Sequence, residues 1–254
     1  MRADDLGRIR HALERAGEIA LRFAPAEVAV HYKAGDSPVT DADLAVDETL
    51  HRELPRADEG WLSEESTDDR ARLDRRRVWV VDPIDGTREF LEGVPEWCVS
   101  IGLVEDGVAV AGGIFAPARG ELLLGAVEDG VTLNGEPVAA SPRGVLAGAL
   151  VLVSRWAARK RSFADAPYRV RAVGPVAYAL GLVASGRADA MWSRGAKREW
   201  DVAAGVALIT AGGGHASTWE GTPIRFNGWP PTVAGILVCG AALAPDVRRH
   251  LATT

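Results

Sequence analysis

Apolar residues recur at helical spacing near the start of the chain, which predicts two amphipathic helices before residue 60. The apolar positions of the first helix are Leu6, Ile9, Leu13, Ala16, Ala20 and Phe23. Pro25 is expected to end this helix, because proline cannot continue one. The segment Thr40-Asp41-Ala42-Asp43 has the form of a capping box and is expected to start the second helix. The apolar face of that helix consists of Val46, Leu50 and Leu54.

The middle of the chain has short runs of β-type residues instead, which predicts a sheet. Residues 77–81, Arg-Val-Trp-Val-Val, form an apolar run that suits a strand buried on both faces. Further runs of this kind are found at 97–104, 108–115 and 121–127. Asn134-Gly135 marks a hairpin turn.

A second half begins near Leu146, and there strands and helices alternate. The expected elements are a strand at 149–153, a helix at 175–185, a strand at 188–192, a helix at 201–211, a strand at 235–239 and a C-terminal helix. We therefore predict a layered α/β fold of the α+β type with antiparallel content. It divides into an N-terminal lobe of residues 1–145 and a C-terminal lobe of residues 146–254.

Composition narrows the class of protein. The chain has 254 residues, a net charge of −6 and 47% hydrophobic residues, which suits a globular protein with a large core and disfavours nucleic acid as a partner. Cys98 and Cys239 are isolated, so neither a disulfide scaffold nor a zinc site is expected. The polar start does not resemble a signal peptide, and no apolar run has membrane-spanning length. We expect a cytoplasmic protein with no membrane association.

The run Asp82-Pro83-Ile84-Asp85-Gly86-Thr87 directly follows the apolar strand at 77–81 and carries the most specific chemistry. Neighbouring carboxylates repel each other unless a cation neutralises them, and oxygen ligands suit Mg²⁺ or Mn²⁺ better than zinc. The Gly-Thr turn offers backbone N–H groups and a hydroxyl to an anion. A metal together with an anion points to phosphate chemistry.

Two other interpretations suit this run. A Pro-Asp-Gly turn at the end of a strand is common and needs no function. The nucleophile loop of haloacid-dehalogenase-type phosphatases, Asp-x-Asp-Gly-Thr, is similar, but here the carboxylates are three positions apart instead of two.

Three further acidic segments accompany the run. They are Ser63-Glu64-Glu65-Ser66, Glu199-Trp200-Asp201-Val202-Ala203-Ala204-Gly205 and Ser37-Pro38-Val39-Thr40-Asp41-Ala42-Asp43. Taken singly, each suits an exposed acid or a helix N-cap. Taken together and in this order, they resemble the inositol monophosphatase superfamily of Mg²⁺-dependent, lithium-sensitive phosphomonoesterases. The resemblance covers nearly the whole chain and implies an α-β-α-β-α sandwich with the active site between the lobes.

The resemblance also implies roles for individual residues. A first metal would bind Glu64, Asp82 and the backbone carbonyl of Ile84, a second would bind Asp82, Asp85 and Asp201, and a third, weaker one would bind Glu64 and water. Thr87 and Asp43 would form a hydrogen-bonded pair that orients and deprotonates a metal-bound water. The backbone N–H groups of Gly86 and Thr87 would hold the phosphate. Mg²⁺ is the expected metal, with Mn²⁺ as a substitute.

The substrate is indicated less directly. Inositol-specific members commonly have an acid seven positions before the Trp-Asp aspartate, and here that position is Arg194. Residues 88–90, Glu199 and residues 151–155 are similar to the 3′(2′),5′-bisphosphate nucleotidase branch instead. We expect Arg194, Lys197 or Arg155 to meet a second phosphate, because a dianion needs cationic partners. The alternative is a solvated basic loop.

Other functions on the same fold remain open at this point. Inositol-1-phosphate is the second expected substrate, and histidinol phosphate is the third. A regulatory binding protein on this fold would be expected to lack some metal carboxylates, whereas this chain has all of them. The superfamily also implies a homodimer.

Overall fold

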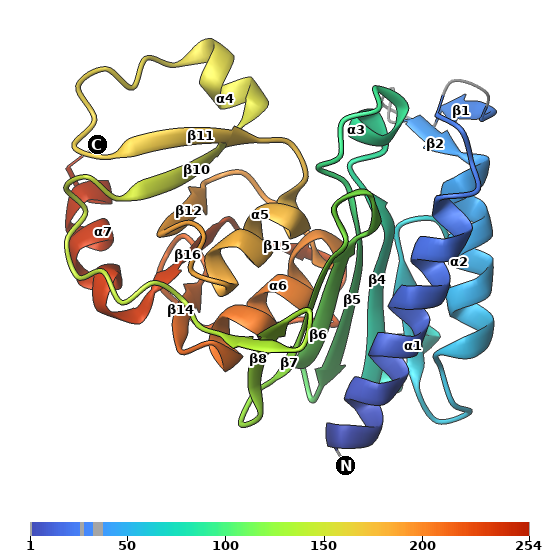
Figure 1. The fold of residues 1–254 in the computed structure, drawn as a ribbon. Coiled ribbons are helices and arrows are strands. Elements are labelled where there is room, and N and C mark those ends of the chain that lie inside the picture. The colour runs from blue at the N-terminus through green and yellow to red at the C-terminus, as the bar shows by residue number, and fades with distance from the viewer. Residues whose placement is uncertain (1, 26–27, 33–37, 254) are drawn as a thin grey trace.

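A seven-stranded sheet and a five-stranded sheet are stacked with a layer of helices between them (Figure 1). The computed structural model describes residues 2–25, 28–32 and 38–253. From right to left in Figure 1, the layers are α1 (Arg2–Ala20) with α2 (Asp41–Glu53), the large sheet, α5 (Val176–Ala184) with α6 (Glu199–Ala211), the small sheet, and α7 (Ala244–Leu251). This α-β-α-β-α sandwich confirms the predicted fold class.

The large sheet consists of consecutive strands that lie side by side in chain order. They are β3 (Gly60–Ser63), β4 (Arg77–Asp85), β5 (Cys98–Glu105), β6 (Val108–Ala116), β7 (Glu121–Ala126), β8 (Gly130–Leu133) and β9 (Glu136–Val138). β3 pairs parallel with β4, and every later pair is antiparallel. Asn134 and Gly135 both have positive φ at the β8–β9 turn, so the predicted hairpin is confirmed.

The small sheet mixes parallel and antiparallel pairs. Its order is β11 (Arg169–Val173), β10 (Leu150–Ser154), β12 (Ala190–Ser193), β16 (Ile236–Gly240) and β14 (Gly214–Ser217). Two-stranded sheets join β1 (Val30–Tyr32) to β2 (Pro38–Thr40) and β13 (Lys197–Arg198) to β15 (Thr232–Val233). Short helices α3 (Thr87–Leu91) and α4 (Arg155–Lys160) follow β4 and β10.

Strand β4 is buried on both faces, as its sequence predicted. Its side chains alternate, so Val78 and Val80 pack in the cluster that contains α5 and α6, while Trp79 and Val81 pack in the cluster that contains α1 and α2. The strand extends to Asp85, so Asp82 and Asp85 both belong to its last four residues before α3. Burial of the strand therefore carries these carboxylates into the interior.

Helix α6 packs unusually close to the large sheet. A Cβ atom built on Gly102 would lie 2.9 Å from Ala203 Cβ, and one on Gly112 would lie 2.7 Å from the Ala204 carbonyl oxygen. The small residues Ala203 and Ala204 of α6 are thus opposed by glycines on β5 and β6. The helix begins at Glu199, two residues before the predicted start. Close approach brings its first turn next to the end of β4.

The end of the first helix differs from the expected one. Helix α1 ends at Ala20, and tighter hydrogen bonds such as Arg22 N–H to Ile19 O, at 3.0 Å, turn the chain before it reaches Pro25. Ser37, at the start of one acidic segment, lies outside the described residues.

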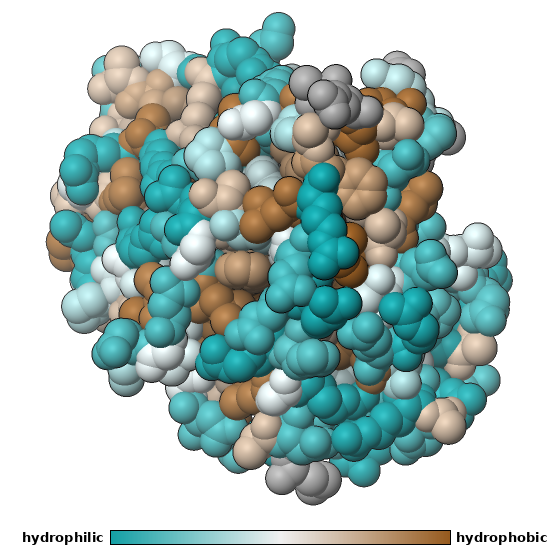
Figure 2. Space-filling model, turned by 45° about the vertical axis from the view of Figure 1, so that its right-hand side comes forward, coloured by the Kyte–Doolittle hydropathy of each residue, from teal (hydrophilic) through white to brown (hydrophobic). Residues whose placement is uncertain are grey.

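In the described part of the chain, no helix is long and apolar enough to span a membrane. Figure 2 shows hydrophilic side chains over the lower part of the face turned toward the viewer and hydrophobic ones in its middle and upper parts.

Candidate active site

The register of β3 against β4 places Glu64 beside Asp82. Ser63 is paired with Val81 in this parallel ladder, and the Glu64 N–H donates to the Val81 carbonyl oxygen at 3.3 Å. Glu64 is the first residue after β3, so its neighbour on β4 is Asp82. Two acids far apart in the sequence thus meet at one end of the sheet.

Helix α6 supplies the third carboxylate from the C-terminal half of the chain. Asp201 lies in its first turn, where the Arg198 N–H donates to Asp201 Oδ2 at 3.4 Å. One carboxylate oxygen each from Glu64, Asp82 and Asp201 lie within 4.8 Å of one another. The structure therefore brings these three predicted site residues together.

Asp85 lies next to this group but has a further contact. Its Oδ2 accepts a hydrogen bond from the Ala177 N–H, at 2.5 Å, in the first turn of α5. The Cys98 thiol lies 4.0 Å from the same oxygen. Asp85 therefore links the end of β4 to the layer of helices between the two sheets.

Burial and mutual repulsion raise the pKa values of Asp82, Asp85 and Asp201. Burial, followed by the charge of Glu64, raises the pKa of Asp82 well above 3.8, and burial with the charge of Asp201 does the same to the pKa of Asp85. Burial and the charge of Glu64 raise the pKa of Asp201 to about 7. Carboxylates in this state bind protons or a cation to relieve the repulsion.

Asp43 and Thr87 form a hydrogen-bonded pair beside the acids. The Thr87 hydroxyl donates to Asp43 Oδ1 at 3.1 Å, with the Ile84 carbonyl oxygen 3.3 Å away. The other oxygen of Asp43 accepts from the Thr40 N–H and hydroxyl, which confirms the predicted capping box at the start of α2. Burial raises the pKa of Asp43 above 3.8 despite these bonds. The cap thus fixes a carboxylate that faces Thr87.

Gly86 turns the chain between β4 and α3. Its φ is +101°, and a Cβ atom there would lie 2.6 Å from Pro175 Cγ and 3.3 Å from Trp97 Cβ. Only glycine suits both the conformation and the space. The turn leaves the Thr87 N–H at the first position of α3, where backbone N–H groups have no acceptor within the helix.

Comparison with known proteins shows the family of this chain. A sequence model described as the inositol monophosphatase family matches residues 7–252. The chain belongs to the inositol monophosphatase family. Its relatives include the Nus factor SuhB of Xylella fastidiosa, 35% identical over 83% of this chain and 80% of that protein. The 3′-phosphoadenosine 5′-phosphate phosphatase of Mycobacterium leprae is 35% identical over 72% of this chain and 70% of that protein.

A solved structure supports the same assignment. The inositol monophosphatase of Anabaena superposes with a TM-score of 0.78 and 27% identity, over 99% of this chain and 96% of that one. Together with the family match, this makes the protein a phosphomonoesterase of the inositol monophosphatase family. The family is metal-dependent, and the acidic cluster is a place where a metal ion can bind.

The residues present fit a divalent metal ion. The donors are carboxylate oxygens, which hard cations such as Mg²⁺ and Mn²⁺ prefer. A cation would neutralise the repulsion that raises the pKa values of Asp82 and Asp201. Ser100, which pairs with Asp82 across β4 and β5, has a buried hydroxyl with no hydrogen-bond partner among the described residues. The site therefore has one buried polar group, the Ser100 hydroxyl, that a bound ion or its water could satisfy.

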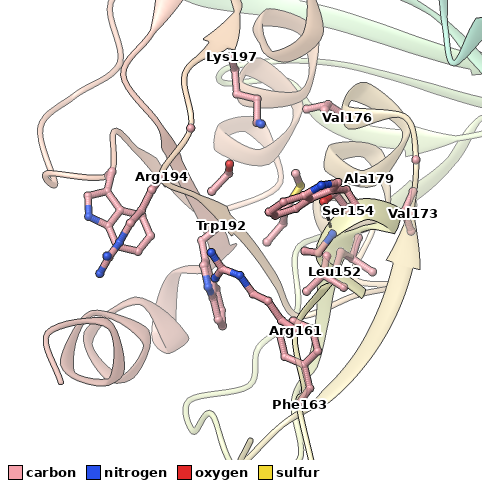
Figure 3. A pocket seen from close by; sticks show the side chains of 18 of the residues that line it. Leu152, Ser154, Arg161, Phe163, Val173, Val176, Ala179, Trp192, Arg194 and Lys197 are labelled. Atoms are coloured by element: carbon pink, nitrogen blue, oxygen red, sulfur yellow. Dashed lines mark hydrogen bonds between the residues drawn. The ribbon is translucent and has the colours of Figure 1, made fainter. Parts of the chain in front are cut away.

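A cavity of about 490 Å³ opens beside the acidic cluster, within the C-terminal half (Figure 3). Pro175 forms part of its wall and also contacts Gly86, so the cavity begins where the Gly-Thr turn ends. The aromatic residues of its wall are Trp156, Phe163, Tyr168, Trp192, Trp219 and His250. The Tyr168 ring packs edge-on against Trp192 at 5.4 Å and His250 at 5.5 Å. Sequence reasoning missed this cavity, because its wall comes from segments spread between Leu152 and Leu251.

The three predicted cationic ligands lie in different surroundings. Figure 3 shows the Lys197 amine pointing into the cavity, while the Arg194 guanidinium points away from its middle. Arg194 stacks over the Trp219 ring at 4.7 Å. Arg155 is not part of the cavity wall. It pairs instead with Glu89 at 3.1 Å and Glu92 at 3.8 Å. The structure thus brings Lys197 and Arg194 to the cavity wall, whereas Arg155, on α4, is not part of that wall.

Glu199 proves to be a buried connector, a role that its sequence position did not reveal. It is 1% exposed and accepts hydrogen bonds from the N–H groups of Asn227, at 2.8 Å, and Gly228, at 3.0 Å. The buried Arg72 donates to the Asn227 side chain and ion-pairs with Asp68. This network joins the segment after Glu64 to the first turn of α6, which carries Asp201.

Proposed function

We propose that this phosphomonoesterase is Mg²⁺-dependent and hydrolyses a 3′(2′),5′-bisphosphate nucleotide, such as adenosine bisphosphate. The observation that supports this substrate is the aromatic-walled cavity with Lys197 and Arg194 at its edge. A planar base binds favourably to aromatic surfaces, whereas the hydroxyl-covered ring of inositol calls for polar partners.

Glu64, Asp82, Asp85 and Asp201, with the Ile84 carbonyl, would hold the Mg²⁺ ions, and Mn²⁺ would substitute. When bound, these ions neutralise the phosphate oxygens, make hydroxide available near neutral pH and stabilise the departing alkoxide. By analogy with the family, lithium is expected to inhibit the enzyme. The carboxylates come from both halves of the chain, so the bound ions would also join the two halves around the phosphate.

Thr87 and Asp43 would orient the attacking water. Because Thr87 donates its own proton to Asp43, its oxygen is left to accept a hydrogen bond from water. The raised pKa of Asp43, caused by burial, suits a carboxylate that takes up a proton during the reaction. The N–H groups of Gly86 and Thr87 would hold the phosphate at the turn.

The second phosphate of the substrate would meet the cations of the cavity. Lys197 points into the cavity, so it is the first expected partner. Arg194, which stacks over the Trp219 ring, would reach the same space only by rotating its side chain. Arg155 would join only by exchanging its longer ion pair, with Glu92 at 3.8 Å, for the phosphate.

A second candidate is inositol-1-phosphate hydrolysis, which the solved structure of the Anabaena inositol monophosphatase favours. A regulatory role beside catalysis has support in the name of the Xylella relative, a Nus factor. The proposal also places the protein in the cytoplasm as a homodimer, and light scattering on the purified protein tests the dimer.

The substrate is tested by phosphate release with Mg²⁺, comparing 3′-phosphoadenosine-5′-phosphate, inositol-1-phosphate and histidinol phosphate. We expect the bisphosphate to have the highest kcat/KM. Arg194→Glu should raise KM for the bisphosphate and leave KM for inositol-1-phosphate unchanged. Arg70→Glu is the matched control, because Arg70 also stacks on an indole, that of Trp229 at 3.9 Å, but lies outside the cavity. A preference for the inositol ester would contradict the proposed substrate.

A further inference from the structure

Both serines of Ser63-Glu64-Glu65-Ser66 are bound to one buried carboxylate of α2. The Ser63 hydroxyl donates to Asp47 Oδ1 at 2.5 Å, and the Ser66 hydroxyl donates to Asp47 Oδ2 at 2.5 Å. Asp47 is 8% exposed. Its two oxygens thus hold the two ends of the segment that contains Glu64.

The same face of α2 contacts this region over three successive turns. Asp43 and Asp47 are four residues apart, so their side chains lie one above the other. One turn further, the His51 ring stacks on Trp61 at 4.8 Å, and the Trp61 indole N–H donates to the Ser66 hydroxyl at 3.2 Å. One helix therefore fixes both the Thr87 partner and the Glu64 segment.

We propose that Asp47 is a positioning residue that holds Glu64 beside Asp82 and thereby sets the affinity of the site for divalent cations. This inference rests on the proposed role of Glu64 as a metal ligand. Glu64 lies just beyond the end of β3, where its backbone N–H donates to the Val81 carbonyl oxygen at 3.3 Å. Because a glutamate side chain is long and flexible, fixing its backbone on both sides reduces the freedom that metal binding would otherwise remove.

The test is the binding of Mg²⁺ alone, measured by calorimetry on the whole protein. Loss of an outer partner of a metal ligand typically weakens metal binding about 10- to 100-fold, and we expect a rise of that size in the Kd of Asp47→Ala. At saturating Mg²⁺, kcat should return to within a few-fold of the wild-type value, because Asp47 does not touch the reacting groups. Asp47→Asn, which keeps one acceptor oxygen, should lie between the two. If Asp47→Ala does not fold, Ser66→Ala removes one of the two bonds and should give a smaller rise in Kd.

Asp189 provides the matched control. It also accepts a serine hydroxyl at 2.5 Å, from Ser141, together with the Leu150 N–H at 2.7 Å, but it lies in the C-terminal half away from the acids. Asp189→Ala should lower the unfolding temperature and leave the Mg²⁺ Kd unchanged. An Asp47→Ala protein that behaves in the same way would overturn the proposal. If wild type and Glu64→Gln bind Mg²⁺ equally well, the proposed metal role of Glu64 fails instead.

Discussion

Glu64 and Asp82 are neighbours because Ser63 pairs with Val81 in the parallel ladder between β3 and β4. A slip of one residue in that register would turn the two carboxylates to opposite faces of the sheet. The core side chains on both faces of β4 prevent such a slip. The packing of a strand that is buried on both faces therefore determines the geometry of the acidic cluster.

Thr87→Val tests the hydroxyl that faces Asp43. Valine has nearly the same size but cannot pass a proton or accept one from water, so kcat should fall by about 10²- to 10⁴-fold with little change in KM. Thr87→Ser keeps the hydroxyl and should recover most of the rate. Steady-state kinetics on both variants checks this, and equal rates for Thr87→Val and Thr87→Ser would exclude a role for the hydroxyl.

The stability of the metal-free protein should fall as the pH rises from about 4 to about 7. Asp201 has a pKa raised from 3.8 to about 7, so the folded state binds more protons than the unfolded state in that range. Added Mg²⁺ should therefore raise the unfolding temperature more at pH 8 than at pH 5. Thermal unfolding with EDTA and with Mg²⁺ measures this, and an equal shift at both pH values would contradict it.

Glu59 provides a pH-dependent contribution of the opposite sign. Burial raises its pKa, but hydrogen bonds from Arg8, Trp79 and the Arg56 N–H outweigh burial and hold the pKa at about 2. Its stabilisation is therefore present above pH 4.5 and is lost as the pH falls through about 2. Glu59→Gln should lower the free energy of unfolding by about 2–3 kcal/mol at pH 7, and by much less near pH 2.

Urea unfolding of Glu59→Gln at both pH values measures the difference. Glu14→Gln is the control, because Glu14 on α1 is half exposed and should change little at either pH. A destabilisation of Glu59→Gln that does not depend on pH would show that lost packing, not charge, is responsible.

Gly112→Ala tests the close packing of α6 on the large sheet. The new methyl group would lie 2.7 Å from the Ala204 carbonyl oxygen and 2.9 Å from its Cα, and backbone atoms cannot move aside easily. We expect a loss of about 1–3 kcal/mol in the free energy of unfolding. Gly7→Ala, on α1 with nothing within 4 Å, should instead be neutral or stabilise by up to about 1 kcal/mol. Equal effects of the two substitutions in urea unfolding would contradict this packing.

Local signals explain why much of the fold could be predicted from the sequence. The capping box at Thr40, the apolar run before Asp82 and the Asn134-Gly135 turn each depend on a few adjacent residues, and all three are present in the structure. β3 was missed as a strand, because four residues carry too little periodicity to be recognised.

The remaining features depend on contacts between distant parts of the chain. Arg72 and Asn227 are 155 residues apart, and no pattern in either segment indicates their hydrogen bond. The aromatic cavity likewise forms only when β10, β12 and α7 come together. The family's sequence motifs therefore predicted acids that lie together in the structure, but not the side chains that hold them in place.

In the proposed function, carboxylates from both halves of the chain hold the cation on which phosphate release depends. The most direct test is a Mg²⁺ titration of phosphate release by wild type, Asp85→Asn and Asp201→Asn, with the exposed Asp129→Asn as control. Wild type and Asp129→Asn should be inactive in EDTA and gain activity with Mg²⁺, while the other two should lose at least about 100-fold in kcat/KM. Near-normal release by Asp201→Asn, or equal release by wild type with and without Mg²⁺, would contradict the account.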